Sequence, residues 1–321
     1  MSPNEGRVLT AHSGLYDVLG ADGGVTSCRA RRRLRRPETS WPVFPVPGDV
    51  VEWLLLERSG GKSGIIEAVR PRRTEIARVR AGAKHVVVAN LDRLVVVVSV
   101  RHPTFDRGLL DRLLCTAERN RIAALLCLHK IDLADPGEGD VERAVYEKAG
   151  YPMLLTSTTS GAGIEALREA LRGHVSAFMG PSGAGKSHLI SALQPGLSLR
   201  TGMVSEKSGQ GRHTTTRVDL HRTDFGALLA DTPGVREFSL WGLQPEELGP
   251  LFPEIRELQE HCRFASCTHD HEPHCAVKEA VAAGRVDAGR HRSYLAILAE
   301  LRQDALAESR GGAPRRKERN A

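Results

Sequence analysis

Short runs of β-forming residues alternate with turn signals over about the first 75 residues. Residues 43–56 are rich in β-formers and are interrupted by Pro47-Gly48, and residues 65–66 add a short apolar strand. Turn signals recur at residues 20–24 and 59–64. Short strands at this spacing predict a small β-barrel.

From about residue 85 the pattern changes to continuous apolar runs that alternate with helical periodicity. Apolar, often β-branched runs predict strands buried on both faces, and apolar residues spaced by three and four predict helices. The predicted strands are 85–88, 94–100, 122–128, 153–155 and 175–179, and the predicted helices are 107–120, 141–149 and 164–171. This alternation predicts a doubly wound parallel sheet.

After residue 241 no further strand is predicted. A helix-like stretch begins at Pro245, and helices are expected near 276–283 and 293–308. Residues 311–321 are basic and rich in Gly and Pro, which favours a disordered tail. The chain therefore divides into a barrel (1–80), an α/β domain (81–242), a helical domain (243–310) and a tail (311–321).

Composition and charge limit the class of protein. Hydrophobic residues make up 40% and charged residues 26% of 321, as in a globular protein with a real core. No apolar run approaches the about 20 residues of a membrane helix, and no secretory leader is evident, so we expect a cytoplasmic protein with no membrane partner. Six arginines crowd residues 29–36 without an acidic residue, which indicates either a charged solvated edge or a nucleic-acid contact.

A phosphate-binding loop lies where a strand should meet a helix. Its residues fit G-x-x-x-x-G-K-[ST] and are Gly180, Pro181, Ser182, Gly183, Ala184, Gly185, Lys186 and Ser187, followed by His188. The glycines let backbone N–H groups turn toward one anion, and the helix dipole adds to this attraction. Lys186 is expected to reach the β- and γ-phosphates and Ser187 to ligate Mg²⁺.

The remaining motifs distinguish GTP from ATP. Residues 231–234 fit the motif D-x-x-G, in which the Asp, here Asp231, holds Mg²⁺ through water and the N–H of the Gly, here Gly234, contacts the γ-phosphate. Residues 211–216 offer Thr214 or Thr215 as a switch threonine. Upstream, His129, Lys130, Ile131 and Asp132 resemble the N-K-x-D guanine motif. The Asp132 carboxylate can accept two hydrogen bonds from the guanine edge, which adenine cannot supply. Ser157 and Thr158 match the following loop that meets guanine O6.

These motifs occur in a rearranged order, with the base motif first, then the P-loop and then the switches. Such an order is physically allowed because the termini of a parallel-sheet domain lie at its surface and can be rejoined.

Three of the six cysteines cluster near the C-terminal end. Cys262, Cys267 and Cys275 stand with His269 inside 14 residues, and three thiolates with one imidazole suit a closed, structural Zn²⁺ site. Because His261, His271 and His274 lie close by, spacing alone leaves the fourth ligand open.

Together these features resemble a known family, the circularly permuted ribosome small-subunit-dependent GTPase A. The residues that carry the resemblance are Asn90-Leu-Asp92, the permuted motif order, Gly-Arg-His-Thr-Thr-Thr, Asp-Thr-Pro-Gly-Val-Arg-Glu-Phe and the Cys/His cluster. The resemblance implies an N-terminal OB-fold, a central permuted GTPase and a C-terminal zinc domain that docks on the small subunit. It also selects His269 as the fourth zinc ligand. The chain departs from the family at His129, where the family has Asn.

The resemblance implies a GTP hydrolase for late maturation of the small ribosomal subunit, binding rRNA, stimulated by the ribosome and released according to its nucleotide. We expect a monomer with GTP or GDP, Mg²⁺ and one structural Zn²⁺. Val235 stands where many GTPases carry a water-positioning Gln, so His213 is the candidate substitute beside Lys186 and Thr215. We also hypothesise that movement of residues 231–238 pulls on the zinc domain. The alternatives are a P-loop ATPase or kinase, and an RNA-binding assembly scaffold with structural nucleotide.

Overall fold

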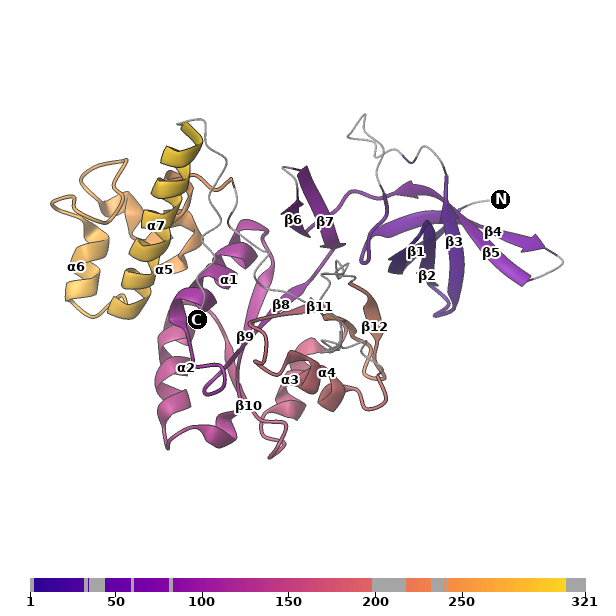
Figure 1. The fold of residues 1–321 in the computed structure, drawn as a ribbon, viewed down its shortest axis with the longest axis horizontal. Helices are drawn as coiled ribbons and strands as arrows, with labels where there is room; N and C mark the ends of the chain where they lie inside the picture. The colour runs from indigo at the N-terminus through magenta and orange to yellow at the C-terminus, as the bar shows by residue number, and fades with distance from the viewer. Residues whose placement is uncertain are drawn as a thin grey trace, which may run out of the picture.

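The computed structural model describes residues 3–31, 34, 44–58, 61–80, 83–197, 218–231, 240 and 242–309. Figure 1 shows a barrel at the N-terminal end, a sheet flanked by helices in the middle and a helical unit at the C-terminal end.

The barrel is built from five short strands. They are β1 (Asn4–His12), β2 (Leu15–Gly20), β3 (Val25–Ala30), β4 (Val50–Arg58) and β5 (Gly61–Val69). The strand order β1-β2-β3-β5-β4 closes on itself through pairing of β1 with β4. Alternate residues such as Val8, Val18 and Ile66 point inward and are fully buried. Closure removes the exposed edges that an open sheet of this size would have.

A hairpin joins the barrel to the central domain. Strands β6 (Glu75–Arg80) and β7 (Ala83–Ala89) pair with each other and form a separate two-stranded sheet. At the junction, the buried Asp49 carboxylate accepts Arg72 Nε at 2.7 Å and Nη2 at 2.9 Å. The Asn90 side chain donates to Gly48 O at 3.1 Å and accepts the Arg73 backbone N–H at 2.8 Å. The barrel is therefore attached through paired polar groups as well as through the chain.

The central sheet has six strands in the order β10-β9-β8-β11-β13-β12. They are β8 (Arg93–Ser99), β9 (Ala123–His129), β10 (Met153–Thr156), β11 (Val175–Met179), β12 (Leu220–Arg222) and β13 (Leu228–Asp231). The first five in this order run parallel, and β12 pairs antiparallel with β13.

Helices cover both faces of this sheet (Figure 1). Helices α1 (Arg107–Arg119) and α2 (Glu138–Lys148) pack in one core cluster, whereas α3 (Ile164–Leu171) and α4 (Lys186–Leu193) pack in the other. Alternate side chains of β8 divide between the two clusters: Leu94 and Val96 face the first, and Val95 and Val97 the second. Because both faces are covered, these strands are continuously apolar, as the sequence predicts.

The C-terminal unit contains only helices and turns among its described residues. The elements are the 3₁₀ turns η3 (Pro245–Glu247), η4 (Gly249–Leu251) and η5 (Gln259–His261), and the helices α5 (Pro253–Arg256), α6 (Ala276–Ala282) and α7 (Ala288–Ser309). The helix-like stretch expected from Pro245 is a series of short turns, because Pro250 and Pro253 lack the N–H that a continuous helix needs. Helix α7 begins five residues earlier than expected, at Ala288.

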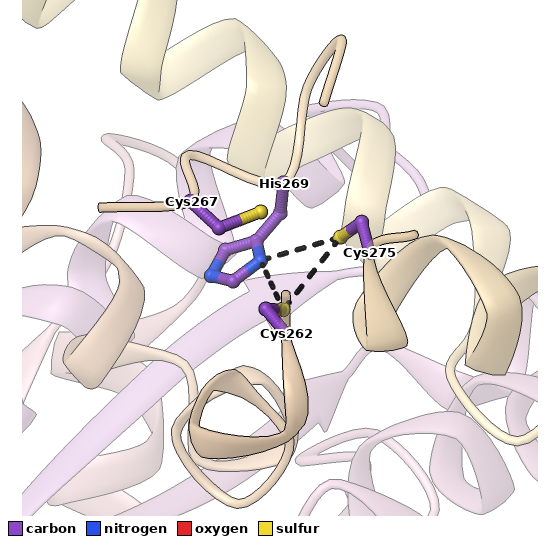
Figure 2. Close-up of side chains that lie close together, drawn as sticks. All are labelled: Cys262, Cys267, His269 and Cys275. Carbon is purple, nitrogen blue, oxygen red and sulfur yellow. Dashed lines mark hydrogen bonds between the residues drawn. The ribbon is translucent and has the colours of Figure 1, made fainter. Parts of the chain in front are cut away.

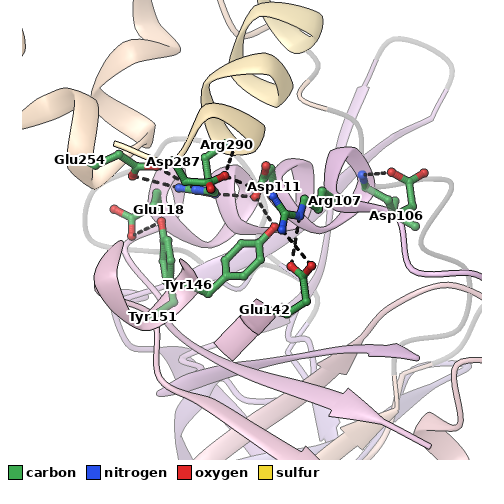
Figure 3. Close-up of polar contacts among 11 residues, drawn as sticks. Asp106, Arg107, Asp111, Glu118, Glu142, Tyr146, Tyr151, Glu254, Asp287 and Arg290 are labelled. Atoms are coloured by element: carbon green, nitrogen blue, oxygen red, sulfur yellow. Dashed lines mark hydrogen bonds and ion pairs between the residues drawn. The ribbon is translucent and has the colours of Figure 1, made fainter. Parts of the chain in front are cut away.

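A buried arginine joins this unit to the central domain (Figure 3). Arg290 of α7 has only 2% of its side chain exposed and donates to Asp111 of α1 at 2.5 Å and to Glu254 of α5 at 2.8 and 3.0 Å. Its guanidinium lies 4.7 Å from the centre of the Phe252 ring, and the Tyr146 hydroxyl donates to the same Asp111 carboxylate at 3.0 Å. One cation therefore neutralises carboxylates from both domains.

The predicted fold class is confirmed: a barrel, a central α/β sheet and a C-terminal helical unit with the Cys/His cluster. Among the described residues, none of the helices is long and apolar enough to cross a membrane.

The Arg290 junction yields a stability prediction. Asp111→Ala leaves a buried guanidinium with one of its two carboxylate partners missing, and breaking a buried pair costs about 3–5 kcal/mol. We expect the urea midpoint to fall accordingly. Asp140→Ala is the matched control, because Asp140 pairs with Arg143 at an exposed site of α2, where such pairs contribute about 1 kcal/mol or less. Equal loss of stability in the two variants would contradict a special role for the junction.

Candidate functional site

The parallel direction of the central strands gathers the predicted nucleotide motifs. The base motif begins at the last residue of β9, its companion loop follows β10, the P-loop follows β11, and Asp231 ends β13. Because these strands are parallel, all four segments leave the sheet at the same carboxyl edge. Residues far apart in the chain thus meet at one site, whatever their order.

The P-loop leaves β11 through a backbone conformation that favours glycine. Gly180 has φ +156, and a Cβ atom there would lie 1.9 Å from Val97 O, so a side chain would collide with the neighbouring strand. Lys186 folds back over the loop and donates to the carbonyl oxygens of Gly180 at 2.9 Å and Pro181 at 3.0 Å. Burial lowers the pKa of Lys186, while the nearby Asp231 carboxylate raises it. The ammonium is thus held inside the loop, where phosphates would approach.

Two oxygen donors meet at the start of α4. The Ser187 hydroxyl donates to Asp231 Oδ2 at 2.9 Å, although the two residues are 44 positions apart. A hydroxyl and a carboxylate beside a phosphate-binding loop are hard oxygen ligands of the kind that Mg²⁺ prefers. The donor set therefore fits Mg²⁺.

The base motif is tied both to the P-loop and to the loop after β10. Lys130 adopts a left-handed conformation and its Nζ donates to Gly183 O at 2.7 Å and to His102 O. The Asp132 carboxylate accepts the Ser157 hydroxyl at 2.5 Å, and this hydrogen bond lowers the pKa of Asp132. Ile131 starts the 3₁₀ turn η1 (Ile131–Leu133), which turns Asp132 outward.

Other predicted nucleotide residues fall at this edge or outside the described residues. Thr158 is exposed beside Ser157, and His188 is exposed on α4. His213, Thr214, Thr215 and Gly234 lie outside the described residues, as does Val235.

The Cys/His cluster converges in space (Figure 2). The ligand atoms of Cys262, Cys267, His269 and Cys275 all lie within 4.8 Å of one another. Cys262 Sγ and Cys275 Sγ are 3.9 Å apart, and they lie 3.6 and 3.5 Å from His269 Nδ1. A tetrahedral zinc site with ordinary bond lengths has S–S edges of about 3.8 Å and S–N edges of about 3.6 Å. Cys262, His269 and Cys275 therefore have the spacing of ligands in a tetrahedral metal site, and the Cys267 ligand atom lies within 4.8 Å of each of them.

Helix α7 and Glu272 hold the metal loop in place. The Tyr294 hydroxyl donates to Thr268 O at 2.9 Å, and His291 Nε2 lies 3.0 Å from His269 O. The Glu272 carboxylate accepts the Thr268 hydroxyl at 2.7 Å and two backbone N–H groups. These supporting residues are absent from the sequence prediction. Glu272 could have been noticed, because it lies inside the Cys/His spacing, whereas nothing in the sequence links the loop to Tyr294.

The fold and the site define a class of protein: a circularly permuted P-loop GTPase between an N-terminal barrel and a C-terminal Cys₃His unit. Comparison with protein families matches residues 69–241 to the model described as "RsgA GTPase". The chain belongs to the RsgA GTPase family, and the family resemblance inferred from its motifs is confirmed.

Relatives match over most of the chain. The "Small ribosomal subunit biogenesis GTPase RsgA" of Moorella thermoacetica is 42% identical over 92% of this chain and 97% of its own length. The protein of that name from Gemmatimonas aurantiaca is 40% identical over 92% of this chain and 97% of its own length. The crystal structure of YjeQ from Thermotoga maritima is 33% identical, with a TM-score of 0.77 over 93% of this chain and 98% of that one. That of "YloQ, a circularly permuted GTPase" is 29% identical, with a TM-score of 0.73 over 94% and 96%.

The metal cluster yields a prediction that separates its candidate histidines. His269→Ala removes a buried imidazole whose Nδ1 faces two thiols, so bound zinc should fall from one ion per chain to a small fraction, and the melting temperature should fall with it. His271→Ala is the matched control, since its side chain is 77% exposed in the same loop. The measurement is metal content by mass spectrometry together with thermal unfolding. Full zinc content in His269→Ala, or loss of zinc in His271→Ala, would refute the assignment.

Proposed function

We propose that this GTPase acts in biogenesis of the small ribosomal subunit, binding the subunit and its rRNA late in assembly and leaving after GTP hydrolysis. The observation that carries this proposal is the meeting of P-loop, guanine motif and Asp231 at one sheet edge of a chain that also carries a barrel and a Cys₃His unit. The relatives that share nearly its whole length bear names of that function.

We assign the nucleotide site as follows. Backbone N–H groups of residues 180–185 bind the phosphates, Lys186 neutralises the β- and γ-phosphates, and Asp132 with the loop at Ser157 and Thr158 binds guanine. Ser187 and Asp231 would hold Mg²⁺, which when bound supplies positive charge to the phosphates. Thr214 or Thr215 and the Gly234 N–H are the proposed contacts on the γ-phosphate side.

Hydrolysis at such a site depends on positioning and electrostatics, because the protein forms no covalent bond to the substrate. Val235 cannot orient a water molecule by hydrogen bonding, which predicts slow hydrolysis by the free protein. We propose that His213 orients the attacking water molecule when the small subunit is bound.

We propose that the remaining parts of the chain bind the small ribosomal subunit. Residues 1–80 would contact rRNA through basic side chains such as Arg29 and Arg31, and residues 243–310 would form a zinc-stabilised docking domain. Residues 81–242 form the proposed GTPase unit, and residues 311–321 a basic tail. We propose a cytoplasmic monomer with one structural Zn²⁺, in which movement of residues 231–238 alters ribosome affinity.

One assay tests the proposed function. Steady-state GTP hydrolysis should be slow for the protein alone and rise at least about tenfold with purified small subunits, because a subunit-bound site orders the catalytic groups. Large subunits are the control and should not stimulate. Unchanged turnover with small subunits would instead favour a scaffold whose nucleotide is structural.

A second measurement tests the nucleotide. Asp132→Ala removes the carboxylate that pairs with the guanine edge, so GTP affinity should fall at least about a hundredfold while ATP affinity stays constant. Asp135→Ala, an exposed carboxylate just beyond the same turn, is the matched control and should leave both affinities unchanged. Equal binding of GTP and ATP by the unaltered protein would point to an ATPase or kinase.

A further inference from the structure

His129 stands at the first position of the base motif but is withdrawn from the surface. Only 1% of its area is exposed, whereas Lys130 is half-buried and Asp132 is exposed. The residue ends β9, directly across from Thr156 at the end of β10. Its Nδ1 lies 3.1 Å from Thr156 Oγ1, and both side chains are buried. One edge of the imidazole is therefore committed to the strand that leads into the guanine loop.

The other edge of the ring lies against the P-loop. A Cβ atom placed on Gly185 would stand 2.4 Å from His129 Cδ2 and 2.8 Å from Nε2. These separations are far below van der Waals contact, so the ring occupies the space that any side chain at position 185 would need. Gly185 is also the last P-loop glycine and the N-cap residue that directly precedes α4. The imidazole thus fills the gap between the guanine loop and the phosphate loop.

Burial of the ring favours a neutral imidazole. Burial lowers the pKa of His129, and the cation of Lys130 and the neighbouring His188 act in the same direction, against Thr156 and the Asp132 carboxylate. A neutral ring keeps one nitrogen as a donor and the other as an acceptor. It can therefore bond Thr156 without placing a buried charge on Gly185.

We propose that His129 is a positioning residue, which holds the guanine-reading Asp132 at a fixed distance from the P-loop by bridging Thr156 and Gly185, and that it does not itself read the base. The inference deepens the proposed function and rests on GTP being the substrate. On this view base selectivity resides in Asp132, and His129 contributes to affinity for every nucleotide alike. The histidine then serves as a spacer, and its replacement affects phosphate and base binding together.

The first test is nucleotide affinity across a set of probes. His129→Ala leaves Thr156 unpaired and the ring space empty, so the Kd for GTP, GDP and ATP should each rise about tenfold, with the GTP-to-ATP ratio unchanged. 7-Deaza-GTP lacks the N7 atom that guanine and adenine share. Because His129 does not contact N7 in this proposal, the Kd of 7-deaza-GTP should rise by the same factor in His129→Ala. His129→Asn keeps a polar group near the position of Nδ1 and should restore affinity to within about threefold.

The control for general damage is Cys127→Ala. Cys127 is a fully buried residue of the same strand, and it packs in the core cluster to which α3 and α4 contribute. It should lower the melting temperature while leaving nucleotide affinity unchanged. A His129→Ala variant that melts lower but binds all probes as the unaltered protein does would overturn the proposal.

The second test is a double-mutant cycle with Gly185→Ala. This substitution strains a backbone with φ +99 in either background, so that cost cancels in the cycle, and only the collision with the imidazole remains. We expect the loss of GTP affinity caused by Gly185→Ala to be at least about threefold larger in the unaltered protein than in the His129→Ala background. Additive losses would show that the ring does not bear on the P-loop.

Failure of the inference and failure of the proposed function give different results. If the unaltered protein binds GTP and ATP equally, the assignment of GTP is wrong. If it prefers GTP and His129→Ala changes that ratio by more than about threefold, or abolishes the difference between GTP and 7-deaza-GTP, then His129 contacts the base and the positioning role is wrong.

Discussion

The parallel direction of five neighbouring strands is the constraint on which the nucleotide site depends. Each of these strands ends at the same edge of the sheet, so each following loop contributes to one site. The order in which the chain visits the strands has no effect on this geometry. The permuted motif order is therefore compatible with a complete site. The hydrogen bond from Ser187 to Asp231 at 2.9 Å shows that the segments at the ends of β11 and β13 meet there.

Much of this arrangement could be predicted from local patterns. The P-loop and the base motif are contiguous, and their flanking apolar runs identify the strands that present them. The fourth metal ligand is different, because four histidines lie within the same loop region and spacing fits several of them. His269 itself adopts a left-handed backbone conformation, with φ 59, and the neighbouring Thr268 is held by Glu272. This local turn directs the imidazole toward the thiols. That geometry depends on folded contacts and has no signal in spacing.

Arg290 is the clearest case of what local patterns miss. The sequence predicts a helix near 293–308, and the polar run Arg290-His291-Arg292 lies just before it. In the structure Arg290 is buried because its partners arrive from Asp111, 179 positions away, and Glu254, 36 positions away. A charged residue is stable in such a place only when these carboxylates are present. Pairing between distant elements explains why Arg290 is buried, whereas the start of α7 has a local cap, because the Asp287 carboxylate accepts the Arg290 backbone N–H at 2.9 Å.

Consecutive residues of α7 serve different neighbours. Arg290 enters the core between α1 and α5, while His291 and Tyr294 bind the carbonyl groups of the metal loop. The C-terminal unit therefore cannot be exchanged independently of the central domain. A chain shortened before this unit would leave Asp111, fully buried here, without its cation. A chimaera that exchanges C-terminal units between relatives must therefore inherit residues 111 and 290 as a compatible pair.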